Sequence, residues 1–139
     1  MYPISQSKTG SGTCTAIFPD IYQNPFQMGI GVQLLTGGGV TTAIIAIEHS
    51  FDYRVVMAPS FNGLTALLDG VIQTAAWFPN AGTITAGAAG TTFTATLGTA
   101  GVTAAFNYAF PVAAVRANVI SATATSFVIV NFLQATNAP

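Results

Sequence analysis

Hydrophobic and polar positions along much of this chain alternate residue by residue, without the spacing of a helix. In Thr92–Leu97, threonines alternate with apolar residues. Successive side chains of a strand point to opposite faces of its sheet, so one face of this segment is expected to be buried and the other exposed. Val115–Val119 repeats the pattern, with Arg116 and Asn118 at the polar positions. Phe127–Leu133 is apolar on both faces, which predicts a strand that is central or covered by a partner.

The composition extends this prediction to the whole chain. Val, Ile, Thr and Phe dominate, and 14 Gly and 7 Pro interrupt them at short intervals, which favours short strands and tight turns. The expected strands are Thr13–Phe18, Gln27–Leu35, Val40–Glu48, Tyr53–Ala58, Val71–Trp77, Thr91–Leu97, Val102–Phe106, Val112–Ile120 and Thr125–Leu133. They predict an all-β fold with two packed antiparallel sheets, either a jelly roll or an immunoglobulin-like sandwich. We favour the jelly roll because the Cys…Trp…Cys pattern of immunoglobulin domains is missing.

The 139 residues suit one domain. We expect a β-sandwich over residues 13–135, an extended arm over residues 1–12 and a tail over residues 136–139. In the arm, Tyr2 and Ile4 alternate with Pro3, which is compatible with an extended segment that pairs with the sheet edge of a neighbouring molecule. A frayed tail without contacts is the alternative.

Two short segments predict local features within the domain. Asn62–Gly70 is the one helix-like stretch, because Leu64, Leu67 and Leu68 would share a helix face and Gly70 would end it. Gly37–Gly39 fits a hairpin loop, since glycine adopts the positive φ values of tight turns. No helix is expected after this glycine run, so it does not predict a phosphate site.

Charge is scarce. Only 3 Lys and Arg and 4 Asp and Glu are present, 5% of the chain, against roughly 25% in an average soluble domain. A compact chain of this mass exposes about 6,800 Å², which leaves roughly one charge per 1,000 Å². Such a surface favours association, and we expect at least a homodimer. The net charge of −1 gives no basic surface, so nucleic acid is not an expected partner.

Membrane insertion, export and disulfide bonding are not expected either. The uncharged stretches are interrupted by Gly, Pro, Asn or Thr, so no transmembrane helix is predicted. The first residues have neither the basic nor the apolar region of a secretory signal. Cys14 is the single cysteine, which excludes an internal disulfide and a multi-cysteine zinc site. It is expected to be a small buried hydrophobic residue.

Candidate chemistry is concentrated in one segment, because Glu48, His49, Asp52 and Arg54 are four of the eight Lys, Arg, Asp, Glu and His residues. A catalytic triad with Ser50 is disfavoured, since adjacent strand residues point to opposite faces. A metal site would lack further histidine or cysteine ligands. We therefore expect no enzymatic activity, no metal and no cofactor, and interpret these residues as solvated or ion-paired.

Four residues are the candidates for binding to another protein. Arg54 and Arg116 are the candidates for ion pairs that set the register of an interface, because arginine binds carboxylates in two-point geometry. Together with Tyr2 and Ile4 of the arm, they are the predicted partner-binding residues. The aromatic residues are scattered along the strands without a basic patch between them, and we interpret them as core.

The C-terminal block Ala109–Val119, followed by Thr123–Ser126 and Phe127–Gln134, carries a resemblance. It resembles small structural proteins of tailed-bacteriophage heads. In size and character the chain is most similar to jelly-roll cement proteins, of the kind found on a short-tailed Bordetella phage. The similarity is one of pattern and covers the last quarter of the chain best.

This resemblance implies a non-enzymatic virion protein. Made in the host cytoplasm, it would decorate the outer surface of the capsid, bind the major capsid protein and stabilise contacts between the subunits of the shell. A tail- or fibre-associated structural protein is the first alternative, because it would have the same composition. A small-ligand or carbohydrate-binding sandwich is the second; it would need a concave patch of Trp or Tyr, and Trp77 is the sole tryptophan.

Overall fold

The computed structural model describes residues 3–22, 26–36, 40–80, 91–95, 102–124 and 126–134. Its elements are the helix α1 (Tyr53–Val56) and the strands β1 (Ile4–Thr9), β2 (Gly12–Thr13), β3 (Met28–Thr36), β4 (Thr41–Ser50), β5 (Thr65–Leu68), β6 (Val71–Thr74), β7 (Phe78–Pro79), β8 (Thr91–Ala95), β9 (Val102–Tyr108), β10 (Ala114–Ala122) and β11 (Ser126–Gln134). Among the described residues, no helix has the length and apolar character needed to span a membrane.

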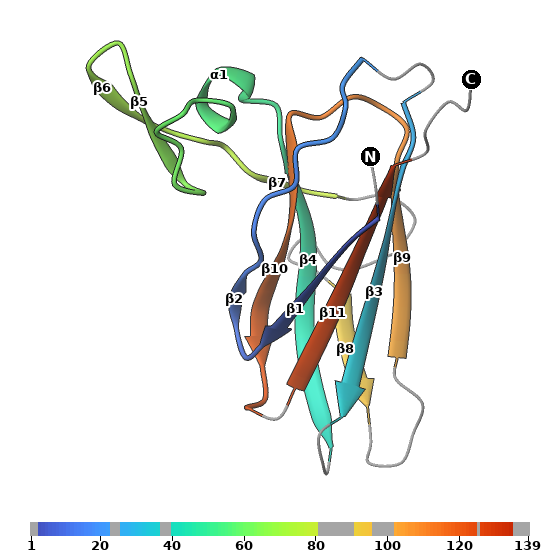
Figure 1. Ribbon diagram of the computed structural model, residues 1–139. Coiled ribbons are helices and arrows are strands. Elements are labelled where there is room, and N and C mark those ends of the chain that lie inside the picture. The colour runs from blue at the N-terminus through green and yellow to red at the C-terminus, as the bar shows by residue number, and fades with distance from the viewer. Residues whose placement is uncertain are drawn as a thin grey trace.

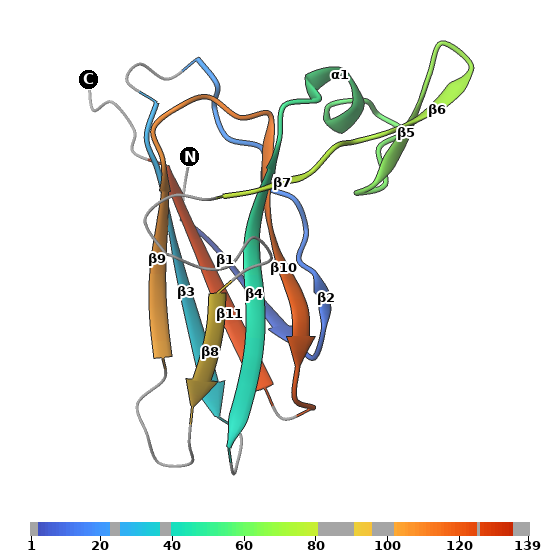
Figure 2. The ribbon, with the colours of Figure 1, turned by 180° about the vertical axis from the view of Figure 1, so that it is seen from behind.

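Two antiparallel sheets form the body of the molecule (Figures 1 and 2). One sheet has the strand order β1-β11-β3-β9, and the other has the order β2-β10-β4, with β7 and β8 paired one after the other along the free edge of β4. We leave out the separate β5–β6 hairpin and count β7 and β8 as one position, which gives eight positions in chain order. The first sheet then holds the first, eighth, third and sixth positions. The second sheet holds the second, seventh, fourth and fifth. This is the strand order of a jelly roll, which confirms the predicted fold class.

The hydrophobic core lies between the two sheets and follows the two-residue alternation of the strands. In β3, the inward residues Met28, Ile30, Val32 and Leu34 are all at most 2% exposed. The other long strands contribute Ala43, Ile45, Ile47, Val115, Ala117, Val119, Val128, Val130 and Phe132. The inward face predicted for Val115–Val119 is therefore confirmed.

The apolar strand β11 is central, as expected, because it pairs with β1 on one side and β3 on the other. Its residues Val128, Val130 and Phe132 are fully buried. On the opposite face, Phe127 is 38% exposed and Leu133 is 54% exposed. The second apolar face is thus only partly covered by the chain itself.

Most predicted strands agree with the structure. The bounds of β3, β4, β9, β10 and β11 lie within two residues of the predicted ones. Strand β8 confirms Thr91–Ala95, while Thr96 and Leu97 lie outside the described residues, as do the predicted Gly37–Gly39 loop and the tail. The prediction for Thr13–Phe18 was too long: Thr13 ends β2, and Ile17 forms only an isolated bridge with Val115.

The expected N-terminal arm is a strand of the chain's own sheet. Residues Ile4–Thr9 form β1, which pairs in register with β11 from Phe132 to Phe127. Ile4 packs against the core, although Tyr2 lies outside the described residues. The predicted boundary between an arm over residues 1–12 and the sandwich was wrong for this segment, because Ile4–Thr9 pairs with the central strand β11 of the same chain.

The segment between β4 and β7 corrects two predictions. Tyr53–Ala58, expected as a strand, begins with the single helical turn α1, in which the main-chain carbonyl of Asp52 accepts the N–H groups of Val55 and Val56 at 3.0 Å. Both valines are buried, within a second small core that includes Ala66 and Ala114. Adjacent strand residues would point to opposite faces, so only a helical turn brings both valines into this core.

Asn62–Gly70, expected as one or two helical turns, instead contains strand β5, which forms a hairpin with β6. The turn residues Asp69 and Gly70 have φ values of 53° and 77°. These values match the two-residue turn that follows the twist of paired strands, for which Asp-Gly is a favoured sequence. Gly70 therefore makes a hairpin turn and does not end a helix. The hairpin projects away from the sandwich beside α1 (Figure 1).

The new position of β1 yields a stability prediction. Deletion of residues 1–8 removes most of a strand from the edge of β11 and the contact of Ile4 with the core. We expect the free energy of unfolding to fall by about 2 kcal/mol, because the partly buried Ile4 side chain and the hydrogen bonds of most of the strand are lost together. That loss lowers the melting temperature by roughly 6 °C or more for a domain of this size. Deletion of residues 1–3 is the control, and an equal melting temperature for both truncations contradicts the prediction.

Candidate interaction surface

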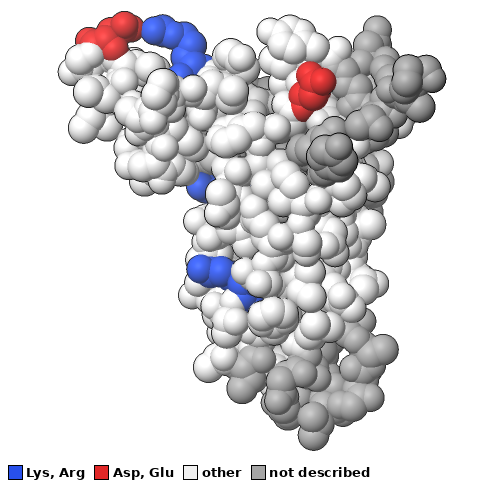
Figure 3. Space-filling model, in the orientation of Figure 1, with Lys and Arg blue, Asp and Glu red and all other residues white. Residues whose placement is uncertain are grey.

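Most charged side chains of the described residues are bound within the chain, and few charges mark the face seen in Figure 3. Arg54 donates to Asp69 at 2.9 Å, and Arg116 donates to Glu48 at 2.8 Å. The Asp52 carboxylate accepts the main-chain N–H of Ala76. The surface therefore offers a partner little net charge that is not already paired.

The Glu48–Arg116 pair joins β4 to β10 on the outer face of their sheet, where the two residues lie directly opposite. Their side chains are only 15% and 13% exposed, and Asn118 donates to the second Glu48 oxygen at 2.9 Å. The Arg116 guanidinium also lies 4.0 Å from the ring centre of Trp77 and donates to the Gly63 carbonyl at 3.4 Å. One arginine thus fixes both ends of the hairpin segment to the sandwich.

The four predicted partner-binding residues do not form one site. Tyr2 lies outside the described residues, and Ile4 is in β1. Arg54 belongs to α1, and its pair with Asp69 is open to solvent, with 72% and 79% of the two side chains exposed. Arg116 is on β10. Among the described residues, no hydrogen bond or ion pair joins any two of Ile4, Arg54 and Arg116, so the sequence did not locate a common surface.

Three phenylalanines that the sequence placed in the core instead form an exposed cluster, which we call the aromatic patch. Phe51, Phe78 and Phe110 are 54%, 47% and 47% exposed. The ring centre of Phe51 lies 6.2 Å from that of Phe78 and 6.1 Å from that of Phe110. Contiguous exposed aromatic side chains of this kind are typical of protein interfaces.

His49 lies beneath the aromatic patch. It is 8% exposed, and its ring centre is 5.0 Å from Phe51, 6.0 Å from Phe78 and 5.9 Å from Phe110. Its Nδ1 atom is 3.2 Å from the hydroxyl of the buried Tyr108. Every patch residue therefore packs against the same buried imidazole.

Burial sets the protonation of both polar groups under the patch. Burial lowers the pKa of His49 below its ordinary value of 6.5, because the imidazolium would lose its hydration. Burial also raises the pKa of Tyr108 far above its ordinary value of 10, and the nearby Glu48 adds to this, while a hydrogen bond with Asn80 acts in the opposite direction. At neutral pH the pair is an uncharged imidazole beside an uncharged phenol.

The geometry of this segment does not assemble a catalytic triad. The Oγ atom of Ser50 accepts the N–H of Asp52 at 3.1 Å, while His49 faces Tyr108. Across the described ranges, no group of three or more His, Cys, Asp and Glu residues is arranged to hold a metal ion.

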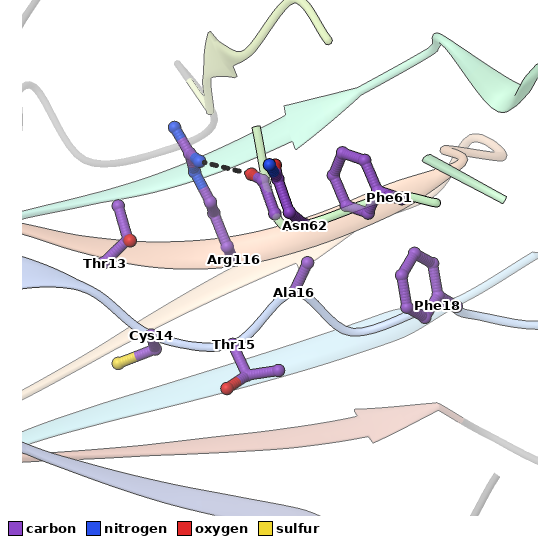
Figure 4. Close-up of a pocket in the computed structure, with 9 residues that line it drawn as sticks. Thr13, Cys14, Thr15, Ala16, Phe18, Phe61, Asn62 and Arg116 are labelled. Carbon is purple, nitrogen blue, oxygen red and sulfur yellow. Dashed lines mark hydrogen bonds between the residues drawn. The ribbon is translucent and has the colours of Figure 1, made fainter. Parts of the chain in front are cut away.

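A groove of about 500 Å³ lies beside Arg116. One wall is the segment from Thr13 to Phe18, and the other is the stretch from Phe61 to Gly63 at the base of the hairpin (Figure 4). Its cationic group, Arg116, already binds Glu48 and Gly63. Burial raises the pKa of the Cys14 thiol, partly offset by Lys8, so the sulfur stays protonated at neutral pH. The groove therefore presents neither a free charge nor a reactive thiolate.

A signal for the aromatic patch was present in the sequence. Phe78 and Phe110 each precede a proline, Pro79 and Pro111. A proline lacks the N–H that a central strand uses, so such residues lie at strand ends and loops more often than in a core. This signal is incomplete, because Phe51 has no proline beside it and Phe26 follows Pro25 but is buried.

The two arginine pairs predict very different contributions to stability. We expect Arg116→Met to lower the free energy of unfolding by roughly 3 kcal/mol, because Glu48 loses its main partner in a largely buried position. Arg54→Met, which opens an exposed pair, is the matched control and should cost less than about 1 kcal/mol. Urea unfolding followed by the fluorescence of Trp77 measures both. Equal losses would show that the buried pair has no special role.

His49 predicts a pH-dependent stability. Its pKa is lower in the folded chain than in the unfolded chain, so below about pH 6.5 the unfolded chain binds the additional proton. The free energy of unfolding should therefore fall as the pH drops from 6.5 toward the folded-state pKa, and should be constant with respect to this group above it. His49→Gln can keep a hydrogen bond to Tyr108 and should flatten this part of the profile. Unchanged profiles in thermal melts of the two proteins would contradict the assignment.

Comparison of the chain with protein families, curated proteins and solved structures gave no match. The resemblance to phage cement proteins carried by the C-terminal block therefore stays a prediction, and the fold and its surfaces are the basis for a function.

Proposed function

We propose that this protein is a non-enzymatic structural protein of a bacteriophage virion. It binds the outside of the capsid through the aromatic patch and stabilises contacts between major capsid protein subunits. The observation that carries the proposal is the exposure of Phe51, Phe78 and Phe110 around one buried histidine. The capsid as partner comes from the resemblance of the C-terminal block.

The shared packing of the three rings against His49 supports this use of the patch. The three phenylalanines come from the ends of β4, β7 and β9, three segments that are far apart in the sequence. Their shared contacts with His49 restrict each ring before a partner arrives. Binding then costs less conformational entropy than it would for mobile side chains, which raises the affinity for a given contact area.

The distribution of charge supports a dry, apolar interface. Both carboxylate oxygens of Glu48 already accept hydrogen bonds within the chain, one from Arg116 and one from Asn118. Attachment through the patch should therefore depend weakly on ionic strength, unlike binding that is steered by free charges. A decoration protein that attaches this way remains bound when the salt concentration changes.

Copurification tests the partner. The tagged chain, isolated from cells in which its phage is assembling, should copurify with a major capsid protein and sediment with capsid shells. Tail or fibre proteins in place of the shell would favour the first alternative and overturn the capsid assignment. A bound small molecule without virion proteins would favour a ligand-binding sandwich and overturn the whole proposal.

Substitutions test the surface. We expect Phe51→Ser and Phe110→Ser each to weaken binding to shells by at least roughly tenfold, because truncation of a central interface aromatic costs about 2 kcal/mol or more. Phe127→Ser, at a partly exposed position of β11 on the other sheet, is the matched control. Cosedimentation at low and high salt measures all three. Equal binding of the patch variants and the control would contradict the role of the patch.

A further inference from the structure

The β5–β6 hairpin has one closed edge and one open edge. Main-chain groups of an antiparallel pair point alternately toward the partner strand and away from it. In β5, Leu67 and Thr65 point away. The N–H and C=O of Leu67 both bond to the Oγ of Ser60, at 2.9 and 3.2 Å. Thr65 donates to Asn62 Oδ1 at 2.9 Å, and its carbonyl accepts the N–H of Asn62 at 3.1 Å. The preceding loop thus satisfies the outer edge of β5.

The outer edge of β6 has no such cover. Ile72 and Thr74 lie opposite Leu67 and Thr65 in the hairpin register, so their N–H and C=O groups also point outward. Ala75, the next residue after Thr74, donates its N–H inward to the Leu64 carbonyl. This bond agrees with the alternation, because the main-chain groups of Thr74 then point outward. Within the described part of the chain, these outward groups of β6 make no hydrogen bond.

This open edge is apolar and unprotected. Val71 and Ile72 are 60% and 70% exposed, and β6 contains no charged residue or proline. The edge strand β1 differs, because it carries Lys8, a charged residue of the kind that discourages pairing with another strand. A two-stranded hairpin is only marginally stable alone in water, so a further strand on the open side would stabilise it.

We infer that the open edge of β6 pairs with the same edge of a second copy of this chain, and that the two hairpins form one four-stranded antiparallel sheet. The pairing places Gln73 opposite Gln73 of the second copy at a two-fold axis. Ile72 then exchanges main-chain hydrogen bonds with Thr74 of the second copy, and Thr74 with its Ile72. The inference does not depend on the proposed capsid role.

Self-pairing is favoured because β6 is complementary to itself. A two-fold axis brings each residue near its own copy, so a charged strand would oppose like charges. Ile72, Gln73 and Thr74 are uncharged. The Gln73 amide carries both donors and acceptors, so two copies can bond across the axis. These features suit a second copy without any charged complement in another protein.

Light scattering of the full chain at several concentrations tests the pairing. We expect a dimer for the native chain and a dissociation constant raised at least roughly 100-fold for Ile72→Lys, because the charge lies at the pairing edge and near its own copy. Leu133→Lys, at a 54% exposed position of β11, is the matched control and should stay dimeric. Circular dichroism checks that both variants fold. A monomeric native chain overturns the inference, as does equal dimerisation of the two variants.

Disulfide trapping tests the register without weakening the edge. In a Cys14→Ser background, Gln73→Cys places two thiols directly opposite at the axis, in a non-hydrogen-bonded pair whose Cβ atoms are close enough for a disulfide. Thr65→Cys, on the closed edge of the same hairpin, is the control. We expect roughly tenfold more disulfide-linked dimer from Gln73→Cys under mild oxidation. Equal trapping at both positions, or none at Gln73, shows that the proposed pairing is wrong.

Discussion

The largely buried ion pair between Glu48 and Arg116 is the interaction on which the arrangement of the outer segments depends. It joins two neighbouring strands of the jelly roll, and the same guanidinium holds Trp77 and the carbonyl of Gly63. Trp77 is followed directly by Phe78 of the aromatic patch, and Gly63 lies two residues before the first residue of β5. One arginine on β10 therefore anchors both ends of the segment that carries the open edge of β6 and leads into Phe78 of the patch.

The sequence predicted the sandwich well because the alternation of apolar and polar residues in its long strands matches the two faces of each sheet. Alternation and β-branched residues located β3, β4, β9, β10 and β11, since each buries one face in a shared core. The signal failed in the segment between β4 and β7. There, Val55 and Val56 have high strand propensity but fill a small second core, so the packing of neighbouring elements selected a helical turn.

The candidate surfaces were less predictable than the fold. A phenylalanine has the same sequence signature in a core and in an exposed cluster, and only the meeting of β4, β7 and β9 places three of them together at the surface. The Asp69-Gly70 turn did carry a hairpin signal. The partners of Ser60 and Asn62, which close one edge of the hairpin, depend on how the loop folds back and cannot be derived from residue spacing.

The pairing of β1 with β11 has a consequence for the synthesis of the protein. These strands stand at opposite ends of the described chain, so the sheet that contains them is complete only after nearly all of the sequence has left the ribosome. Contacts of such long sequence separation form slowly. Until then, apolar faces of the earlier strands stay exposed on a nascent chain that has very few charged residues to keep it soluble. The jelly-roll order itself therefore favours folding after β11 has been synthesised over folding strand by strand during synthesis.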